Sequence, residues 1–170
     1  MSKQTGTVTA EELMNQLASN PEFIAMRAAK EQKRAELLQR INVTISPLLQ
    51  KLADAGYAVD SISSLTSQYA PLSADIVIIV VGFLEGCNDD RIQEALVRCL
   101  AASKQPFDGT VLMKTYKATS SESLKFAILN TIALTRPINI NNWISELRRN
   151  DYVDKKLTDL GWGGVALLDS

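Results

Sequence analysis

The apolar positions of this chain predict α-helices whose pattern recurs with a period of about 32 residues, as in helical repeat proteins. In one segment the apolar side chains are three and four residues apart, as on one face of a helix, at Ile92, Ala95, Leu96, Cys99 and Leu100. The same spacing returns one period later at Leu124, Ala127, Ile128, Thr131 and Ile132. Repeats of this length with two helices each are typical of an α-solenoid, in which neighbouring repeats bury each other's apolar faces.

In the stretch ADIVIIVVGFLEG (74–86), local preference and the repeat disagree. Six of the nine residues from Ile76 to Leu84 are β-branched, and Gly82 costs about 1 kcal/mol in a helix interior, so local preference favours a strand. The same period nevertheless relates apolar pairs at Ile79 and Val80, Val111 and Leu112, and Trp143 and Ile144. We therefore predict a helix here, buried on nearly every side, in which Gly82 allows another helix to approach closely.

Capping residues and prolines predict where the paired helices begin. The pairs Asp89–Asp90 and Ser120–Ser121 are suited to cap the second helix of successive helix pairs, and Pro106 and Pro137 fall near the helix starts. The third pair is degenerate, because YVDKKLTDLG matches the second-helix pattern only through Leu157 and Leu160.

The N-terminal part predicts a short helix followed by a long one. A capping-box pattern at Thr9–Glu12 begins a helix that ends near residue 18, and Asn20 followed by Pro21 begins the long helix. One face of the long helix carries an apolar stripe that is expected to pack on the rest of the domain. This stripe consists of Leu38, Ile41, Ile45, Leu48 and Leu52.

Three residues predict how the long helix ends. Pro47 is expected to kink or restart it, and Gly56 is a suitable left-handed residue at its C-terminus. Asp60 is then expected to cap a further short helix, Ser61–Gln68. Together the patterns predict a single all-α domain, with an N-terminal helical segment at 1–70, helix pairs at 71–160 and a C-terminal tail at 161–170.

The composition indicates a globular protein without a membrane segment. With 170 residues, 46% hydrophobic and 22% charged, the chain can bury a core of its own. We see neither a secretory signal nor an apolar run near the roughly 18–20 residues that span a bilayer, so we expect a cytoplasmic protein. Cys87 and Cys99 form no CxxC pair, which favours free, buried thiols.

The residue types also restrict the chemistry. The sequence contains no histidine, which removes the usual general base near neutral pH and the commonest transition-metal ligand. It contains no GxGxxG or P-loop motif for nucleotides. Asp89, Asp90 and Glu94 could form a carboxylate site, but a helix cap with first-turn acids explains them better. We therefore expect no enzyme activity, no metal and no cofactor.

Three segments of the chain, taken in order, resemble a known family. NPEFIAMRAAKEQKRAELLQR is followed by SPLLQKLADAGYAVDSISSL and then by helix pairs that include DDRIQEALVRCLA. This order, over roughly residues 20 to 135, resembles small bacterial HEAT-like repeat proteins. The resemblance implies an all-α, right-handed superhelix of the armadillo type, in a family largely without assigned activity. It brings no catalytic residues to this chain, and the stretch beyond about Asn150 departs from it.

We expect a non-enzymatic protein-binding scaffold or adaptor that uses the surface of the helical repeats. In helix-pair solenoids the second helices line the inner face, so the sides of these helices away from the apolar pattern are candidates for partner binding. The candidates are Arg91, Glu94, Arg98, Lys125 and Phe126. Alternatively, Phe126 and Leu129 pack against the long N-terminal helix. A narrower hypothesis is an immunity or regulatory protein that binds the product of a neighbouring gene.

Two tryptophans complete the candidate set. Trp143 could stack on a base if the chain were instead a nucleic-acid-binding HEAT-like protein. Its basic cleft would then use Arg91, Arg98, Lys125, Arg148 and Arg149. We do not expect a nucleic-acid partner, because acidic residues nearly balance basic ones, with a net charge of −1. Trp162 lies in the apolar tail GWGGVALLDS, which either covers the end of the last repeat or docks on a partner.

Overall fold

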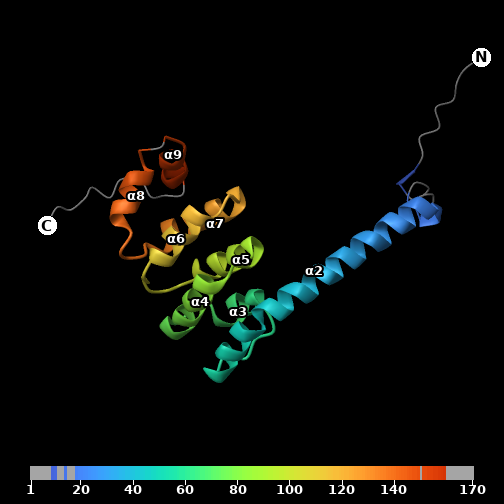
Figure 1. Cartoon of the computed structure of the whole chain (residues 1–170), viewed down its shortest axis with the longest axis horizontal. Coiled ribbons are helices and arrows are strands. Elements are labelled where there is room, and N and C mark those ends of the chain that lie inside the picture. The colour runs from blue at the N-terminus through green and yellow to red at the C-terminus, as the bar shows by residue number, and fades with distance from the viewer. Residues whose placement is uncertain (1–8, 11–13, 15–17, 150, 160–170) are drawn as a thin grey trace, which may run out of the picture. The chain divides into compact units, whose positions relative to one another are not determined.

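The regular structure of the described chain is helical (Figure 1). The computed structural model describes residues 9–10, 14, 18–149 and 151–159. The helices are α2 (Pro21–Asp54), α3 (Ile62–Tyr69), α4 (Ala74–Gly86), α5 (Asp90–Leu100), α6 (Thr110–Ala118), α7 (Glu122–Thr135), α8 (Asn141–Leu147) and α9 (Asp151–Asp159). The all-α prediction is confirmed for these residues. None of their helices combines the length and the apolar character that are needed to span a bilayer.

The chain divides into two units, Met1–Thr44 and Ile45–Ser170, and the division falls inside α2. In the first unit, α2 begins as predicted, because the Asn20 side chain accepts hydrogen bonds from the backbone N–H groups of Glu22 (2.9 Å) and Phe23 (3.4 Å). From Pro21 to Thr44, every side chain is exposed or half-buried. The predicted short helix at 10–18 lies largely outside the described residues.

The prediction that the whole apolar stripe of α2 packs on the rest of the domain is wrong. Leu38 is 50% exposed and Ile41 is only half-buried, so the N-terminal part of the predicted stripe is not packed. The buried part consists of Ile45, Leu48 and Leu52. Pro47 lies inside the helix, which runs on to Asp54, so the proline does not restart it and a kink stays a prediction. Because Pro47 is exposed, water can hydrogen-bond to the backbone carbonyl that the proline leaves without a donor.

The end of α2 follows the prediction, but the start of α3 does not. Gly56 adopts a left-handed φ of +91°, and the N–H of Tyr57 donates to the carbonyl of Leu52 at 2.8 Å, as in a Schellman motif. The cap of α3 is Ser61 and not Asp60, because the Ser61 hydroxyl accepts from the N–H of Ser64 at 3.1 Å. The Asp60 carboxylate instead accepts hydrogen bonds from the two serine hydroxyls.

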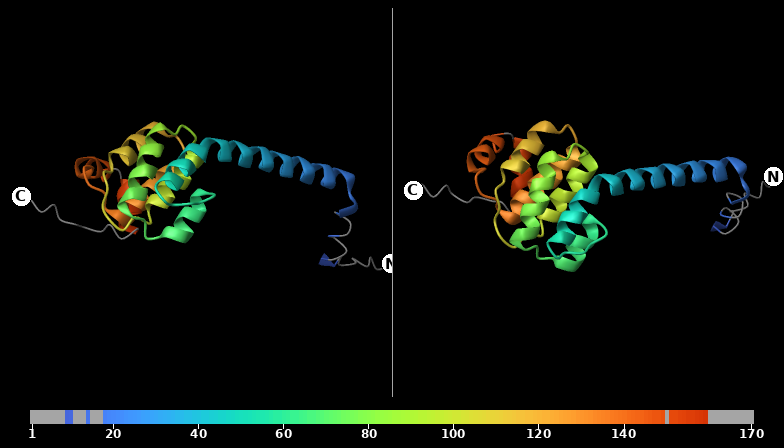
Figure 2. Two further views of the ribbon diagram at one scale, coloured as in Figure 1. Left: turned by 90° about the horizontal axis from the view of Figure 1, so that it is seen from below. Right: turned by 60° about the horizontal axis from the view of Figure 1, so that its bottom comes forward.

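The second unit contains the predicted helix pairs, α4–α5, α6–α7 and α8–α9, which follow one another from green to red in Figures 1 and 2. Of the residues that the 32-residue spacing relates, Ala95 and Ile79 are half-buried and the others are buried. Asp89 and Ser121 cap α5 and α7 through their side chains, as predicted. A second helix, α9, is also present in the third pair, although its sequence matches the pattern weakly.

Corresponding helices of successive pairs pack on each other. The most extensive helix–helix contact joins α5 and α7, and further contacts join α4 to α6 and α7 to α9. Because these helices meet their counterparts in the next pair, their apolar faces are buried between pairs, as the spacing predicts. The right-handed superhelix itself stays a prediction.

The stretch 74–86 forms helix α4, so the repeat overrides its strand preference. The helix is not buried on nearly every side, however, because Ile78 is 68% exposed while Ile76 is 1% exposed. The predicted role of Gly82 is also wrong, because a Cβ atom at this position would meet nothing within 4 Å. Gly82 therefore faces open space and admits no neighbouring helix.

The links between helix pairs lie side by side, a feature that the periodicity does not reveal. Leu72, before α4, forms a parallel bridge with Ser103, and Asp108, before α6, forms one with Ile138. In the second bridge the N–H of Gly109 donates to the carbonyl of Ile138 at 3.0 Å. A Cβ atom on Gly109 would lie 2.9 Å from carbon atoms of Ile140 and Pro137, so this close approach requires glycine.

Replacing Gly109 with Ala is expected to lower the free energy of unfolding by about 1–3 kcal/mol, because the new methyl group overpacks the link. Gly82→Ala is the matched control, since it adds the same methyl group in open space inside a helix. It is expected to raise the free energy of unfolding by about 0.5–1 kcal/mol. Urea denaturation followed by circular dichroism measures both. A neutral Gly109→Ala substitution would show that the two links do not approach as described.

Candidate functional site

An open groove on the second unit brings two of the predicted residues, Lys125 and Trp143, together. The groove has a volume of about 410 Å³ and lies where α6, α7 and α8 meet. Its lining residues are Tyr116, Lys117, Thr119, Lys125, Trp143, Glu146 and Leu147. Three of these side chains are charged, and the aromatic and aliphatic ones supply an apolar wall.

The aromatic wall of the groove is a pair of rings from two different helices. Tyr116 of α6 and Trp143 of α8 meet edge to face, with ring centroids 5.4 Å apart and an interplanar angle of 68°. Trp143 is only 6% exposed, because it occupies the repeat position that corresponds to the buried Val111. The indole is thus a rigid part of the core that forms a wall of the groove, and its edge is fixed by Tyr116.

The charged residues of the groove lie around this wall. Lys125 is 28% exposed at its side chain, and its Nζ lies 3.2 Å from Oε1 of Glu122 and 5.9 Å from the centroid of the Tyr116 ring. Lys117 and Glu146 are exposed. The two lysines and the single carboxylate make the groove's own lining more cationic than anionic, which suits a ligand with carboxylate groups.

Phe126 lies near the lysine of the groove in sequence but has a different neighbour in space. It is 39% exposed, and Nζ of Lys156 from α9 lies 4.6 Å from the centroid of its ring. Leu129 is buried. A contact of the Phe126 ring is therefore with α9.

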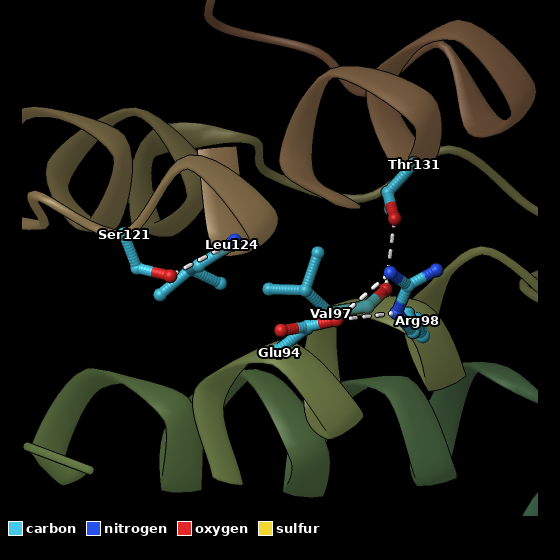
Figure 3. A network of polar contacts seen from close by, with 6 residues as sticks. All are labelled: Glu94, Val97, Arg98, Ser121, Leu124 and Thr131. Carbon is cyan, nitrogen blue, oxygen red and sulfur yellow. Dashed lines mark hydrogen bonds and ion pairs between the residues drawn. The ribbon is translucent and has the colours of Figure 1, made fainter. Parts of the chain in front are cut away.

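The α5 candidates are held within their own network (Figure 3). Nε and Nη2 of Arg98 donate to Oε1 of Glu94 at 3.0 and 2.8 Å. The hydrogen bond from Arg98, and then one from Ser123, lower the pKa of Glu94 below its usual value. Arg91 is exposed at the start of α5. These residues lie outside the lining of the groove, so the structure does not join them to Lys125 and Trp143.

A buried hydroxyl also joins the two helices of this network. Figure 3 shows Thr131 of α7 directed at the backbone of α5, where its Oγ1 donates to the carbonyl oxygen of Val97 at 2.8 Å. Thr131 occupies the repeat position of Cys99. One position of the apolar pattern is therefore polar, and its buried hydroxyl still forms a hydrogen bond. This hydrogen bond fixes α5 against α7, and it places Glu94 and Arg98 by positioning their helix.

Four groove residues with a charged, aromatic or aliphatic side chain were not among the candidates from the sequence. They are Tyr116, Lys117, Glu146 and Leu147. The separation of Tyr116 from Trp143 along the chain corresponds neither to the repeat nor to neighbouring turns of one helix, so no periodicity relates the two rings. The one available signal was that α6 and α8 each carry a large aromatic residue near a core position.

The described residues contain no reactive thiol site and no metal cluster. Both Cys87 and Cys99 are free and buried, as predicted, and burial is the main cause that raises the pKa of each thiol. A raised pKa keeps the thiols protonated and therefore weakly nucleophilic. Among these residues, no three potential ligands gather closely enough to hold a metal ion. Asp89, considered above as part of a carboxylate site, accepts hydrogen bonds from the N–H groups of Arg91 and Ile92.

Trp162, the last predicted candidate, lies outside the described residues, as does the rest of the tail at 161–170.

Comparisons with protein-family models, with curated proteins and with solved structures find no match to this chain. The class that the described chain defines is an all-helical protein whose helix pairs follow the repeat of apolar positions in the sequence.

Proposed function

We propose that this chain is a non-enzymatic, cytoplasmic protein-binding scaffold or adaptor that holds a segment of its partner in the groove between α6, α7 and α8. The observation that carries the proposal is the pairing of a rigid Tyr116–Trp143 wall with the cations of Lys117 and Lys125. Because Trp143 is 6% exposed, the half-buried Tyr116 ring provides more of the aromatic contact area, and a ring already fixed in position costs little conformational entropy when a partner binds. Lysines beside the two rings select carboxylates and help to orient the partner.

The helix pairs support a wider form of the same proposal. We propose that they continue as a HEAT-like right-handed superhelix, in line with the family resemblance, since corresponding helices pack pair upon pair. Such an arrangement places the second helices on one surface, where Arg91, Glu94, Arg98 and Phe126 would extend the binding area. An immunity or regulatory protein for a neighbouring gene product is the narrower form of this proposal.

Nucleic-acid binding is less well supported by the site. Phosphate binding needs several cations without compensating carboxylates on one surface. One of the predicted cations is paired, because Nη2 of Arg98 lies 2.8 Å from Oε1 of Glu94. The groove also contains Glu146. A protein segment with both acidic and apolar side chains fits this mixture better.

The proposal is tested by selecting peptides from a displayed random library on the immobilised full chain. We expect the selected peptides to combine aromatic or aliphatic residues with carboxylates. Lys117→Glu is expected to weaken their binding about tenfold, because it reverses a charge in the groove. Lys114→Glu is the matched control: it makes the same change on α6, outside the lining of the groove, and is expected to change binding less than about twofold.

Fluorescence anisotropy with labelled copies of the selected peptides measures these affinities. The proposal is wrong if no peptide family is enriched. It is also wrong if the Lys117→Glu and Lys114→Glu variants bind the selected peptides equally well.

A further inference from the structure

One face of α2 in the first unit combines cations with apolar residues and has no acidic residue of its own. Its positions are spaced alternately four and three residues apart, so they lie along one side of the helix. We call this the basic–apolar face, and it consists of Phe23, Arg27, Lys30, Arg34, Leu37 and Ile41. The three cations are exposed in the middle, and the three apolar residues are half-buried at the two ends.

The acidic residues of this part of α2 lie on its other sides. Glu22 and Glu36 do not belong to the four-and-three series. Glu31 borders the face, and its Oε1 lies 3.3 Å from Nε of Arg27, but the two side chains are 68% and 72% exposed. An ion pair so open to water contributes little, so Arg27 can exchange Glu31 for a carboxylate of a partner.

We propose that the basic–apolar face binds a second, acidic partner segment, with carboxylates at its centre and apolar residues at both ends. From Phe23 to Ile41 the face extends about 27 Å, and the three cations span about 10 Å at its centre. A partner helix of similar length would place its carboxylates opposite Arg27, Lys30 and Arg34. Its apolar ends would cover Phe23 on one side and Leu37 and Ile41 on the other.

The order of charges argues against a second copy of this chain as the occupant. If two such faces met in parallel, Arg27, Lys30 and Arg34 would each face the same cation of the other copy. In the fully overlapping antiparallel arrangement, Lys30 would face Arg34. Like charges in this position destabilise a helix pair and select against it. An acidic partner removes this repulsion and supplies hydrogen-bond acceptors for the guanidinium groups.

The mixed face also argues against a lipid surface or a nucleic acid. Helices that lie in a membrane interface carry their cations on one face and their apolar residues on the opposite one, whereas here both share one face. A surface of phosphates would satisfy Lys30 and Arg34 but would leave the apolar ends without contacts. A protein segment can match both kinds of residue.

The test uses a synthetic helical peptide of about 21 residues, long enough for the whole face, with glutamates at the centre of one side and leucines at both ends. We expect it to bind the full chain in fluorescence anisotropy. Replacing its glutamates with glutamines is expected to weaken binding about tenfold or more, and so is Arg34→Glu in the protein. Gln32→Glu, which also introduces a glutamate but on the opposite side of α2, should alter the affinity by less than about twofold.

Several results would overturn the proposal. One is that the peptide does not bind, and another is that the glutamate and glutamine peptides bind equally well. A third is an equal loss of affinity in the Arg34→Glu and Gln32→Glu variants, with circular dichroism verifying that both variants stay helical. Arg34-dependent binding to phosphatidylserine vesicles or duplex DNA, without binding of the peptide, would assign the face to those ligands. A dimer that Leu37→Ser dissociates would assign it to a second copy.

This proposal does not rest on the function of the groove. Lys117→Glu is therefore expected to leave binding of the glutamate peptide unchanged. If Lys117→Glu abolishes binding and Arg34→Glu does not, the peptide binds in the groove, so the proposal for the face fails while the proposed function is retained.

Discussion

Replacing Ile76 with Ala is expected to lower the free energy of unfolding by about 2–5 kcal/mol, while the same replacement at Ile78 changes it by less than about 0.5 kcal/mol. The two isoleucines lie close together in α4, but Ile76 is 1% exposed and Ile78 is 68% exposed. Truncating Ile76 removes buried methyl groups and leaves a cavity, because the neighbouring helices relax only partly. Truncating Ile78 changes only the side chain's contact with water.

Urea denaturation of both variants, with circular dichroism as the readout, measures the difference. The dependence of unfolding free energy on urea should stay unchanged, because neither substitution alters the surface exposed on unfolding by much. Equal effects at the two positions would mean that α4 is buried on both sides, as the sequence alone predicts. A larger effect at Ile78 would mean that the helix is rotated about its axis.

Trp143→Ala is expected to lower the free energy of unfolding by about 3–5 kcal/mol. The indole is 6% exposed, so its removal leaves a large cavity between α6 and α8. It also removes the edge-to-face contact with Tyr116, and such contacts contribute about 0.5–1.5 kcal/mol beyond the buried area. Trp143→Phe should restore part of the loss, because a smaller ring fills part of the space.

Thermal and urea unfolding provide the measurement, and Phe126→Ala is the control. Phe126 is 39% exposed and contacts Lys156, so its truncation is expected to cost less than about 1.5 kcal/mol. If Trp143→Ala were as stable as the unchanged protein, the indole would be an accessible side chain, as the stacking hypothesis requires. The expected loss of stability would instead show that Trp143 mainly stabilises the core and that its role in the wall of the groove is secondary.

The helix pairs could be predicted because burial between repeats requires apolar residues at periodic positions in the sequence. The positions from Ile92 to Leu100 and from Leu124 to Ile132 are spaced to bury one face, and the structure buries them. At α4 the β-branched residues alone indicate a strand, whereas the repeat of apolar positions predicts the helix that the structure has. Tertiary packing decided the conformation, and the repeat was the sequence signal of that packing.

The wrong predictions concern where packing stops. Periodicity identifies the apolar face of α2 but not the point along the helix where neighbours end, so Leu38 was expected to pack and is exposed. Gly82 in a buried-looking run suggested a close approach, yet whether a neighbour is present depends on the arrangement of other helices. Ser61 and Asp60 are both good caps, and only the backbone geometry distinguishes them.

The groove could be predicted only in part. Lys125 and Trp143 were both candidates, but the spacing that made Trp143 a core residue also made it a poor choice for an exposed stacking residue. Tyr116, Lys117 and Glu146 enter the groove because α6 and α8 meet, and this contact between segments far apart in the chain has no local signal. The basic–apolar face is local and follows from the sequence of α2 alone.

The paired links have a consequence for how such a chain can lengthen during evolution. Each link bonds to the next one, through Leu72 and Ala102 and then through Gly109 and Ile138, and α5 and α7 carry their own capping residues, Asp89 and Ser121. A duplicated segment of one repeat length would therefore bring its own cap, its own buried face and its own link. Gene duplication could add a helix pair between existing ones without requiring compensating changes elsewhere in the array.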